Sequence, residues 1–167
     1  MNLTEYYDKI YTLSFINRYT NVIRVKNEDV AQHSFFVAAL VLKLHEKYDF
    51  DLGKALQAAI SHDMSEADLS DVTHDVKVNF PDLAHEISIA ELEVLKKYPK
   101  SVLDGVEIFL SNSTEGLIAN LADVVQVQQY LSNEISLGNK KMFQIEAKTR
   151  ERRNALEQEL KQYERIV

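Results

Sequence analysis

The chain has 167 residues, of which 46% are hydrophobic and 27% are charged, and it contains no cysteine. This is the composition of an ordinary soluble globular protein, and the length suits one domain, 1–167. The absence of cysteine excludes disulfides, thiolate zinc sites and thiol nucleophiles, so a cytoplasmic location is expected. A net charge of −7 opposes binding to a nucleic-acid polymer. No run of about 18 apolar residues predicts a membrane span.

The apolar residues follow a helical spacing along almost the whole chain, which predicts an all-α fold. Asn27 is the predicted N-cap of the second helix, and Pro81 and Pro99 flank the fourth. The segment 64–80 is less regular and is predicted to be a loop, a usual place for functional residues. About seven helices are expected, at 3–17, 29–48, 52–63, 82–97, 100–111, 115–137 and 140–163.

Ionisable residues lie on the apolar faces of the second and third expected helices. On the second helix, His33 faces the same way as Val37, Leu40, Val41 and Leu44. The third helix has an apolar stripe made of Leu52, Ala55, Leu56, Ala59 and Ile60. Asp63 continues this stripe, and His62 lies beside it at the last turn. These three side chains are therefore expected to point into the core.

A fourth ionisable residue, Asp123, lies in a helix that is apolar nearly all round. Burial of a carboxylate is costly unless it has a partner. Taken singly, each of the four groups has an ordinary explanation: a core histidine bonded to a carbonyl, an aspartate held by backbone amides, or a histidine in solvent at the end of a helix. Taken together, two imidazoles and two carboxylates suit one divalent manganese, cobalt, iron, nickel or zinc ion, whose charge offsets the burial of both carboxylates.

The chain offers a second His-Asp pair, His74 and Asp75, which is an alternative to His62 and Asp63. It follows a polar stretch, residues 70–73, and no apolar stripe leads into it, so a solvated loop histidine is expected there. His45 and His85 have charged neighbours in sequence and are expected at the surface.

Short runs of sequence, in a fixed order, carry a resemblance to a known family. They are 13–19 (LSFINRY), 28–34 (EDVAQHS), 62–66 (HDMSE), 121–123 (LAD), 137–139 (LGN) and 147–149 (AKT). In this order they resemble the HD-domain metal-dependent phosphohydrolase superfamily, and within it they are similar to the bacterial 5′-deoxynucleotidase branch. The resemblance covers nearly the whole chain. It implies a compact HD-domain helical bundle that assembles as a homodimer.

The resemblance also implies roles for particular residues. The metal ligands would be His33, His62, Asp63 and Asp123, the catalytic carboxylates Glu66 and Asp71, and a phosphate contact Arg18. One metal ion per site is expected, because members that bind two carry further histidines soon after the His-Asp pair, and residues 64–69 contain none. Manganese, cobalt or another transition metal would serve.

The residues around the expected site have chemistry of their own. Glu66 comes four residues after His62, so one more helical turn would bring it beside the metal, where a carboxylate can orient or deprotonate water. Asp71 could complete the proton transfers. Arg18 offers a fork of donors to a phosphate. Lys77 is a second candidate cation, for which a surface salt bridge is the alternative interpretation.

Tyr19 is a departure from the branch, whose best-known members carry tryptophan beside the arginine, where the ring bears on sugar selection. Tyrosine keeps an aromatic wall for a substrate and adds a hydroxyl. The residues after Asp71 also differ, because the family often has a proline-containing turn there. We therefore expect a substrate-binding role for Tyr19, with the preference for deoxyribose left open.

Three functions fit these residues. The first is removal of the 5′-phosphate from nucleoside or deoxynucleoside monophosphates, giving a nucleoside and phosphate. The second is a deoxynucleoside triphosphate triphosphohydrolase, which attacks the same phosphorus but needs further cations, with Arg24, Lys26 and Lys77 as candidates. The third is a nucleotide-sensing module without turnover, against which the presence of both Glu66 and Asp71 argues.

Overall fold

The computed structural model describes residues 1–165, apart from the side chains of His74 and Asp75. Within this part the β-type pairs are isolated bridges, and the expected all-α fold is confirmed. None of the helices described is long and apolar enough to cross a membrane. Three short 3₁₀ helices lie at Leu13–Phe15, Lys140–Met142 and Lys161–Tyr163. The α-helices are α1 (Leu3–Thr12), α2 (Val30–Leu44), α3 (Leu52–Ser61), α4 (Glu66–Leu69), α5 (His74–Asn79), α6 (Pro81–Leu95), α7 (Lys100–Leu110), α8 (Thr114–Ser136) and α9 (Phe143–Leu160).

The first helix is shorter than its apolar spacing predicts. α1 ends at Thr12, and after a 3₁₀ turn Ile16 is extended, with φ −92° and ψ 108°. The carbonyl of Ile16 accepts a 3.0 Å hydrogen bond from the backbone of Val30, and Asn17 forms a bridge with Asp29. The expected helix 3–17 therefore fails at its end, because these residues pair with the start of α2.

The predicted N-cap of the second helix is wrong. The cap of α2 is Asp29, whose carboxylate accepts a 2.8 Å hydrogen bond from the backbone N–H of Gln32. Asn27 instead accepts a hydrogen bond from the side chain of Arg24. An aspartate at an N-cap satisfies a free amide and also favours the positive end of the helix dipole.

The segment 64–80 is not the uninterrupted loop that the sequence predicts. Past the end of α3, backbone N–H groups of Met64 and Glu66 bond to the carbonyls of Ser61 and Asp63 at 3.0 and 3.1 Å. The chain thus continues in tight turns into α4, and α5 follows after a short extended stretch. These turns bring Glu66 back toward the end of α3.

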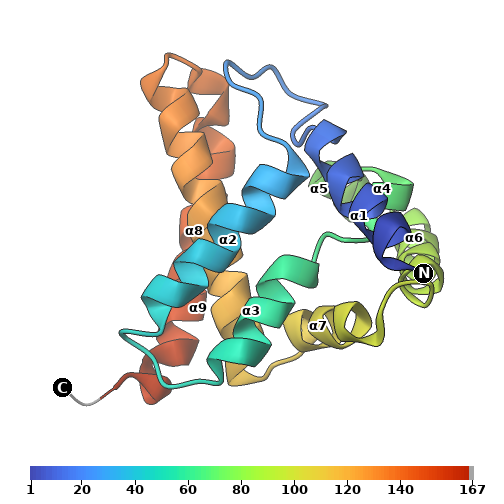
Figure 1. Ribbon diagram of the computed structural model, residues 1–167. Helices are drawn as coiled ribbons and strands as arrows, with labels where there is room; N and C mark the ends of the chain where they lie inside the picture. Colours follow the sequence, from blue (N-terminus) through green and yellow to red (C-terminus); the bar gives the residue numbers. More distant parts are fainter. Residues whose placement is uncertain (166–167) are drawn as a thin grey trace.

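The centre of the molecule is formed by α2, α3 and α8, which pack against one another, with α9 along α8 and α7 against α3 (Figure 1). Alanines line the inner faces, including Ala55 and Ala59 on α3 and Ala122 on α8, all fully buried. Small side chains allow the helices to approach closely. A second group of helices, α1 and α4–α6, lies at the right of Figure 1 around Leu13 and Met64.

Gly105 fixes the approach of α7 to α3. A Cβ atom at this position would lie 2.6 Å from Ser61 Oγ and 2.7 Å from the carbonyl oxygen of Gln57. Any larger residue would push α3 away at its C-terminal end. This end carries the His62-Asp63 pair, so the glycine helps to position it.

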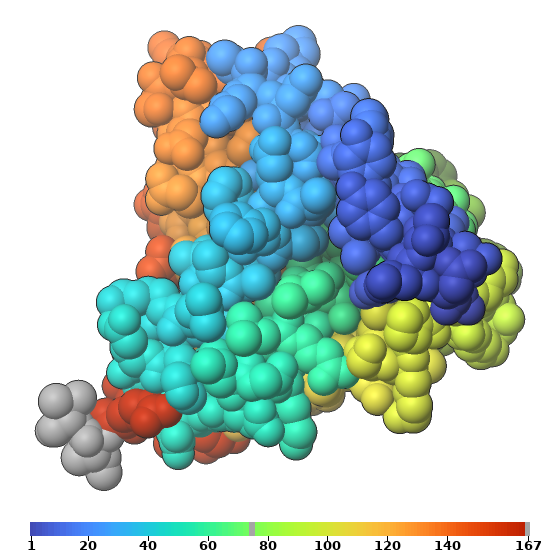
Figure 2. Space-filling model, viewed as in Figure 1, coloured from blue at the N-terminus to red at the C-terminus, as the bar shows by residue number. Residues whose placement is uncertain are grey.

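α1 lies on the surface and buries none of its residues; it is the dark blue helix in Figure 2. Its outer side carries an aromatic row in which the Tyr7 and Tyr11 rings stack at 5.9 Å and the Tyr11 and Phe15 rings meet edge to face at 5.1 Å. All three side chains are exposed. Phe35 and Phe36 on α2 are exposed as well.

Candidate metal and substrate site

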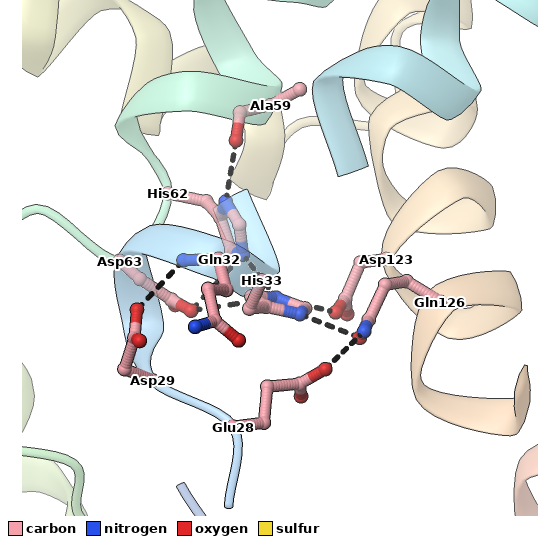
Figure 3. A network of polar contacts seen from close by, with 9 residues as sticks. All are labelled: Glu28, Asp29, Gln32, His33, Ala59, His62, Asp63, Asp123 and Gln126. Atoms are coloured by element: carbon pink, nitrogen blue, oxygen red, sulfur yellow. Dashed lines mark hydrogen bonds and ion pairs between the residues drawn. The ribbon is translucent and has the colours of Figure 1, made fainter. Parts of the chain in front are cut away.

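Three helices bring the four predicted ligands together in the core. His33 lies near the start of α2, His62 and Asp63 follow directly after α3, and Asp123 lies in α8. Figure 3 shows their side chains converging from these three elements. The helical register places them there, since His33 and its apolar partners share one face of α2.

The distances within this group are short. His33 Nε2 lies 3.2 Å from His62 Nε2 and 3.3 Å from Asp123 Oδ1. One ligand atom from each of these residues lies within 4.8 Å of the other two, which is close enough for one ion. Asp63 Oδ2 adjoins this set, 3.2 Å from His62 Nε2 and 3.6 Å from His33 Nε2. The site thus gathers two imidazoles and two carboxylates.

Both histidine rings present Nε2 to the group and use Nδ1 elsewhere. His62 Nδ1 donates a 2.9 Å hydrogen bond to the carbonyl of Ala59, which can only accept. His33 Nδ1 lies 2.7 Å from the side-chain oxygen of Gln126. Two Nε2 lone pairs facing each other at 3.2 Å need a proton or a cation between them. The donor set fits a borderline divalent metal.

The charges in the site favour the ionised forms of its two carboxylates. Burial alone would raise the pKa of Asp63, but the positive charges of His62, His33 and Arg18 hold it well below its usual range. The pKa of Asp123 is also lowered, since the hydrogen bond to His33 outweighs burial. Both carboxylates are therefore ionised at neutral pH.

Arg18 reaches the same centre from the loop 16–29. Its backbone N–H donates a 2.9 Å hydrogen bond to the carbonyl of Glu28, which pins the loop at its base. Burial would lower the pKa of the guanidinium, but the negative charges of Asp63, Asp123 and Glu28 raise it above its ordinary value. The buried NH1 group has no hydrogen-bond partner in the described part of the chain. Arg18 thus offers a charged donor inside the site.

Glu66 and Asp71 are both perturbed by the same centre. Burial, reinforced by the negative charges of Asp63 and Asp71, raises the pKa of Glu66 to about 9. Burial also raises the pKa of Asp71, and Arg18 opposes that rise. Within the described residues, Glu66 Oε2 is buried without a hydrogen-bond partner. A carboxyl group with so high a pKa is typical of a functional site.

Lys77 lies on α5, further from the centre. Its ammonium forms a 3.0 Å ion pair with Glu91 of α6, and its side chain is exposed. Its charge still lowers the pKa values of Glu66 and Asp71. The surface salt bridge considered from sequence is therefore present.

The sequence model of the YfbR-like 5′-deoxynucleotidases matches residues 5–164, which is almost the full chain. The chain belongs to the YfbR-like 5′-deoxynucleotidase family. The predicted resemblance is thereby confirmed, as is the prediction of a hydrolase that acts on phosphate monoesters.

Curated relatives and solved structures agree with this family. The 5′-deoxynucleotidases of Yersinia pestis strain Pestoides F and Yersinia pseudotuberculosis serotype I strain IP32953 are each 25% identical over 160 residues, 87% of this chain and 81% of theirs. The structure of the PH0347 protein from Pyrococcus horikoshii OT3 is 25% identical, with a TM-score of 0.74 over 94% of this chain and 99% of that one. An HD-domain phosphohydrolase from Listeria innocua has a TM-score of 0.73 at 20% identity, over 89% and 78%. The expected HD fold is confirmed.

In this YfbR-like family member, Tyr19 has an unusual backbone and a half-buried ring. Its φ of 57° is in the left-handed region, which is uncommon for a residue other than glycine. The ring stacks on Tyr130 of α8, with centroids 4.8 Å apart and planes at 7°. Its hydroxyl is buried without a hydrogen-bond partner in the part of the chain described.

The loop that carries Arg18 and Tyr19 is held by a residue that sequence reasoning missed. Glu134 of α8 is fully buried, and its carboxylate accepts 2.7 Å hydrogen bonds from the backbone N–H groups of Val25 and Lys26. Burial alone would raise the pKa of Glu134, but these bonds and one from Asn139 lower it. A signal was present, because Glu134 follows buried Tyr130 and Leu131 at helical spacing.

A cavity of about 500 Å³ lies between α2 and α8, beside the site but separate from the metal group. Glu28 and Gln126 line it together with apolar side chains such as Phe36 and Leu40, and none of the four candidate ligands does. Glu28 and Gln126 are both buried polar residues that sequence reasoning did not single out.

The other histidines lie away from this centre. His85 is exposed, and His45 is partly buried with its ring 4.9 Å from that of Phe50. The alternative His74-Asp75 pair lies outside the described side chains.

Proposed function

We propose that this chain is a metal-dependent 5′-nucleotidase that hydrolyses nucleoside or deoxynucleoside monophosphates to a nucleoside and phosphate. Membership of the YfbR-like 5′-deoxynucleotidase family supports the reaction. The observation that carries the proposal is the convergence of two inward-facing Nε2 atoms, two ionised carboxylates and the unpartnered NH1 of Arg18 at one buried point.

The proposed ligands of one divalent cation are His33, His62, Asp63 and Asp123. Their mixture of imidazole nitrogen and carboxylate oxygen suits manganese, cobalt or another transition metal. When bound, such a cation polarises a phosphate oxygen and lowers the pKa of a water molecule.

Arg18 is proposed to bind the phosphate of the substrate. Its free NH1 can donate to a phosphate oxygen, and its positive charge offsets the charge that builds on the phosphoryl group. The guanidinium lies among carboxylates that keep it charged. It therefore needs no protonation step before it binds.

Glu66 and Asp71 are proposed to handle water and protons. With a pKa of about 9 the Glu66 carboxyl holds a proton at neutral pH until a nearby positive charge lowers that value. Its unpartnered Oε2 can then orient the attacking water, and Asp71 can pass a proton to the leaving oxygen.

Tyr19 is proposed to form the wall against the sugar, since its ring is fixed by Tyr130 and its hydroxyl is unpartnered. Lys77 is proposed as a peripheral charge at the rim of the site, where it lowers the pKa values of Glu66 and Asp71. Hydrolysis of triphosphates is less favoured, because two of the three cations that it would require are already paired. Arg24 donates to Asn27 and to the carbonyl of Tyr19, and Lys77 is paired with Glu91.

Chromatography of the products tests the proposal. Purified protein is incubated with Mn²⁺ or Co²⁺ and, separately, with 5′-mono- and triphosphates of ribo- and deoxynucleosides. Nucleoside and orthophosphate from monophosphates are expected. Nucleoside and intact triphosphate would establish a triphosphohydrolase instead, whereas thermal stabilisation by nucleotides without any product would establish a sensing module.

A Glu66→Ala variant tests the assignment of the carboxylate. It should still bind Co²⁺ but lose activity, because the attacking water is no longer oriented. Glu151→Ala, at an exposed position on α9, is the matched control and should remain active. Full activity in Glu66→Ala would remove Glu66 from the mechanism.

We also propose that the protein works as a homodimer in the cytoplasm. The exposed aromatic row on α1 and the exposed Phe35 and Phe36 offer apolar surface for a second copy. Sedimentation of the purified protein should give twice the monomer mass, and a monomer at micromolar concentration would contradict the dimer.

A further inference from the structure

Gln126 connects a candidate metal ligand to a buried carboxylate. It lies on α8, three residues after Asp123, and is 6% exposed. Its Oε1 lies 2.7 Å from His33 Nδ1, and its Nε2 donates a 2.5 Å hydrogen bond to Glu28 Oε1. Figure 3 shows Gln126 joined by one dashed contact to His33 and by another to Glu28.

The direction of these hydrogen bonds follows from chemistry. An ionised carboxylate can only accept, so the amide of Gln126 must turn its NH₂ group to Glu28. The amide oxygen then faces His33 Nδ1, which must carry the proton. Nε2 of His33 is then free to present its lone pair to a cation held between it, His62 and Asp123. The reversed amide would place two acceptors 2.5 Å apart and move the proton to Nε2.

Glu28 is held in place at the end of this series of hydrogen bonds. It is 5% exposed, and its backbone carbonyl accepts the 2.9 Å hydrogen bond from Arg18 N–H. Burial raises its pKa, and the charge of Arg18 opposes that rise. Arg18 thus supports both the phosphate side and the ligand side of the site.

The other histidine provides a comparison within the same site. His62 is held by the carbonyl of Ala59, an acceptor that its own helix supplies. For His33 of α2, by contrast, the acceptor facing Nδ1 is the side-chain oxygen of Gln126, which comes from α8. The same helix therefore contributes one ligand, Asp123, and the group that orients another.

We propose that Glu28 and Gln126 are positioning residues, which lock His33 in the tautomer with a free Nε2 and so set the affinity of the site for its metal. The inference rests on the proposed metal site. Orienting partners of this kind raise the basicity of a ligating histidine and fix its ring.

Titration of the EDTA-treated protein with Co²⁺, followed by visible absorption, tests the proposal. Gln126→Leu keeps the volume but removes the acceptor, and the affinity for Co²⁺ should fall about 10- to 100-fold. Gln129→Leu is the matched control, since its side chain bonds to Asn133 on the same helix and should leave the affinity unchanged. Equal affinity for Co²⁺ in the Gln126→Leu variant and the wild type would refute the positioning role of Glu28 and Gln126.

A double exchange, Glu28→Gln with Gln126→Glu, separates orientation from packing. The new amide at position 28 can donate to the new carboxylate at position 126, which still accepts from His33 Nδ1. Affinity should return to within about threefold of the wild type. A tenfold loss in the folded exchange variant would overturn the proposal, even where Gln126→Leu fails to fold.

A second readout does not depend on metal. In ¹⁵N-edited spectra the Nδ1–H proton of His33 should be protected from exchange in the wild type and in the exchange variant, and it should be lost from view in Gln126→Leu. Failure of the wild type to bind Co²⁺ would refute the proposed metal site itself. Equal Co²⁺ binding by the wild type and all variants would refute only the positioning role of Glu28 and Gln126.

Discussion

The two sides of the candidate site are built in different ways. The proposed metal ligands come from the long helices α2 and α8 and from the end of α3, which pack together in the core. The proposed phosphate and sugar contacts, Arg18 and Tyr19, come from the loop 16–29. Packed helices fix a few side chains within narrow limits, whereas loops tolerate change. The comparison suggests that the hydrolytic chemistry is constant and that the choice of substrate can vary.

The largest expected effect is on the helical side. Asp63→Asn keeps the shape of the side chain but removes one of the two charges that would face the metal. Activity on deoxynucleoside monophosphates should fall by ~1000-fold, because several kcal/mol of charge stabilisation are lost. Co²⁺ affinity, measured on the same sample, should fall with it. Asp8→Asn at the exposed surface is the control; normal activity in Asp63→Asn would break the assignment of the helical side.

On the loop side, Arg18→Ala should lower kcat/KM by about 100-fold, the usual loss for a donor that stabilises a developing charge. Arg18→Lys should lose about tenfold, since it keeps the charge without the fork. Neither variant should weaken Co²⁺ binding. Arg18→Ala removes a positive charge that repels the cation, and Arg18→Lys leaves that charge in place. A parallel loss of Co²⁺ affinity would show that the helical side and the loop side of the site are not independent.

The carboxyl of Glu66 lies between the two sides and predicts a pH effect. Its pKa in the folded protein is about 9 and its ordinary value is 4.5, so the unfolded chain loses this proton first. Stability of the metal-free protein should therefore fall as pH rises from 4.5 to 9 on account of this group. Glu66→Gln should raise the Tm at pH 9, by roughly 3 °C for each kcal/mol regained, and leave it unchanged near pH 4. An equal Tm shift at both pH values would contradict the raised pKa.

Tyr19→Phe removes a buried hydroxyl that has no partner in the described part of the chain. Folding should not suffer, and the Tm should rise by about 2 °C, since an unpaired buried polar group costs about 1 kcal/mol. The ratio of kcat/KM for ribo- over deoxynucleoside monophosphates should change several-fold, with Co²⁺ affinity constant. A clear fall in Tm would mean that the hydroxyl has a structural partner.

The smallest effect is expected at Lys77. Its exposed ion pair with Glu91 contributes little, at most about 1 kcal/mol. Lys77→Ala should change kcat/KM by less than about twofold in steady-state assays. A tenfold loss would place Lys77 at the phosphate and extend the loop side of the site to α5.

The sequence alone predicts the helical side of the candidate site better than the loop side. Helical periodicity predicts the burial of His33, Asp63 and Asp123, because a charged residue on an apolar face can be recognised in a single sequence. Arg18 and Asp71 lie in segments without helical periodicity, and only the family resemblance points to them. The boundary of α1 was missed for a related reason, since pairing between Asn17 and Asp29 overrides the local helical pattern.

The partners of Gln126 and Glu134 could not be assigned from local pattern, although the helical spacing of Glu134 after Tyr130 and Leu131 signals its burial. Gln126 is uncharged, and its partner Glu28 is 98 residues away in the chain. Glu134 bonds to backbone amides 108 and 109 residues earlier, a contact that leaves no mark on either stretch of sequence. Polar groups that are buried as hydrogen-bonded pairs can be identified only in the packed structure.

The hydrogen bonds of Glu134 have a consequence for the order in which activity appears during synthesis. The loop with Arg18 is made early, but the carboxylate that holds it belongs to α8, as does Asp123. A growing chain that has emerged only as far as α7 therefore lacks the proposed ligand Asp123 and the carboxylate that holds the loop of Arg18. On the proposed mechanism, hydrolysis of nucleotides is expected to begin only when the last third of the polypeptide has left the ribosome and folded against the first.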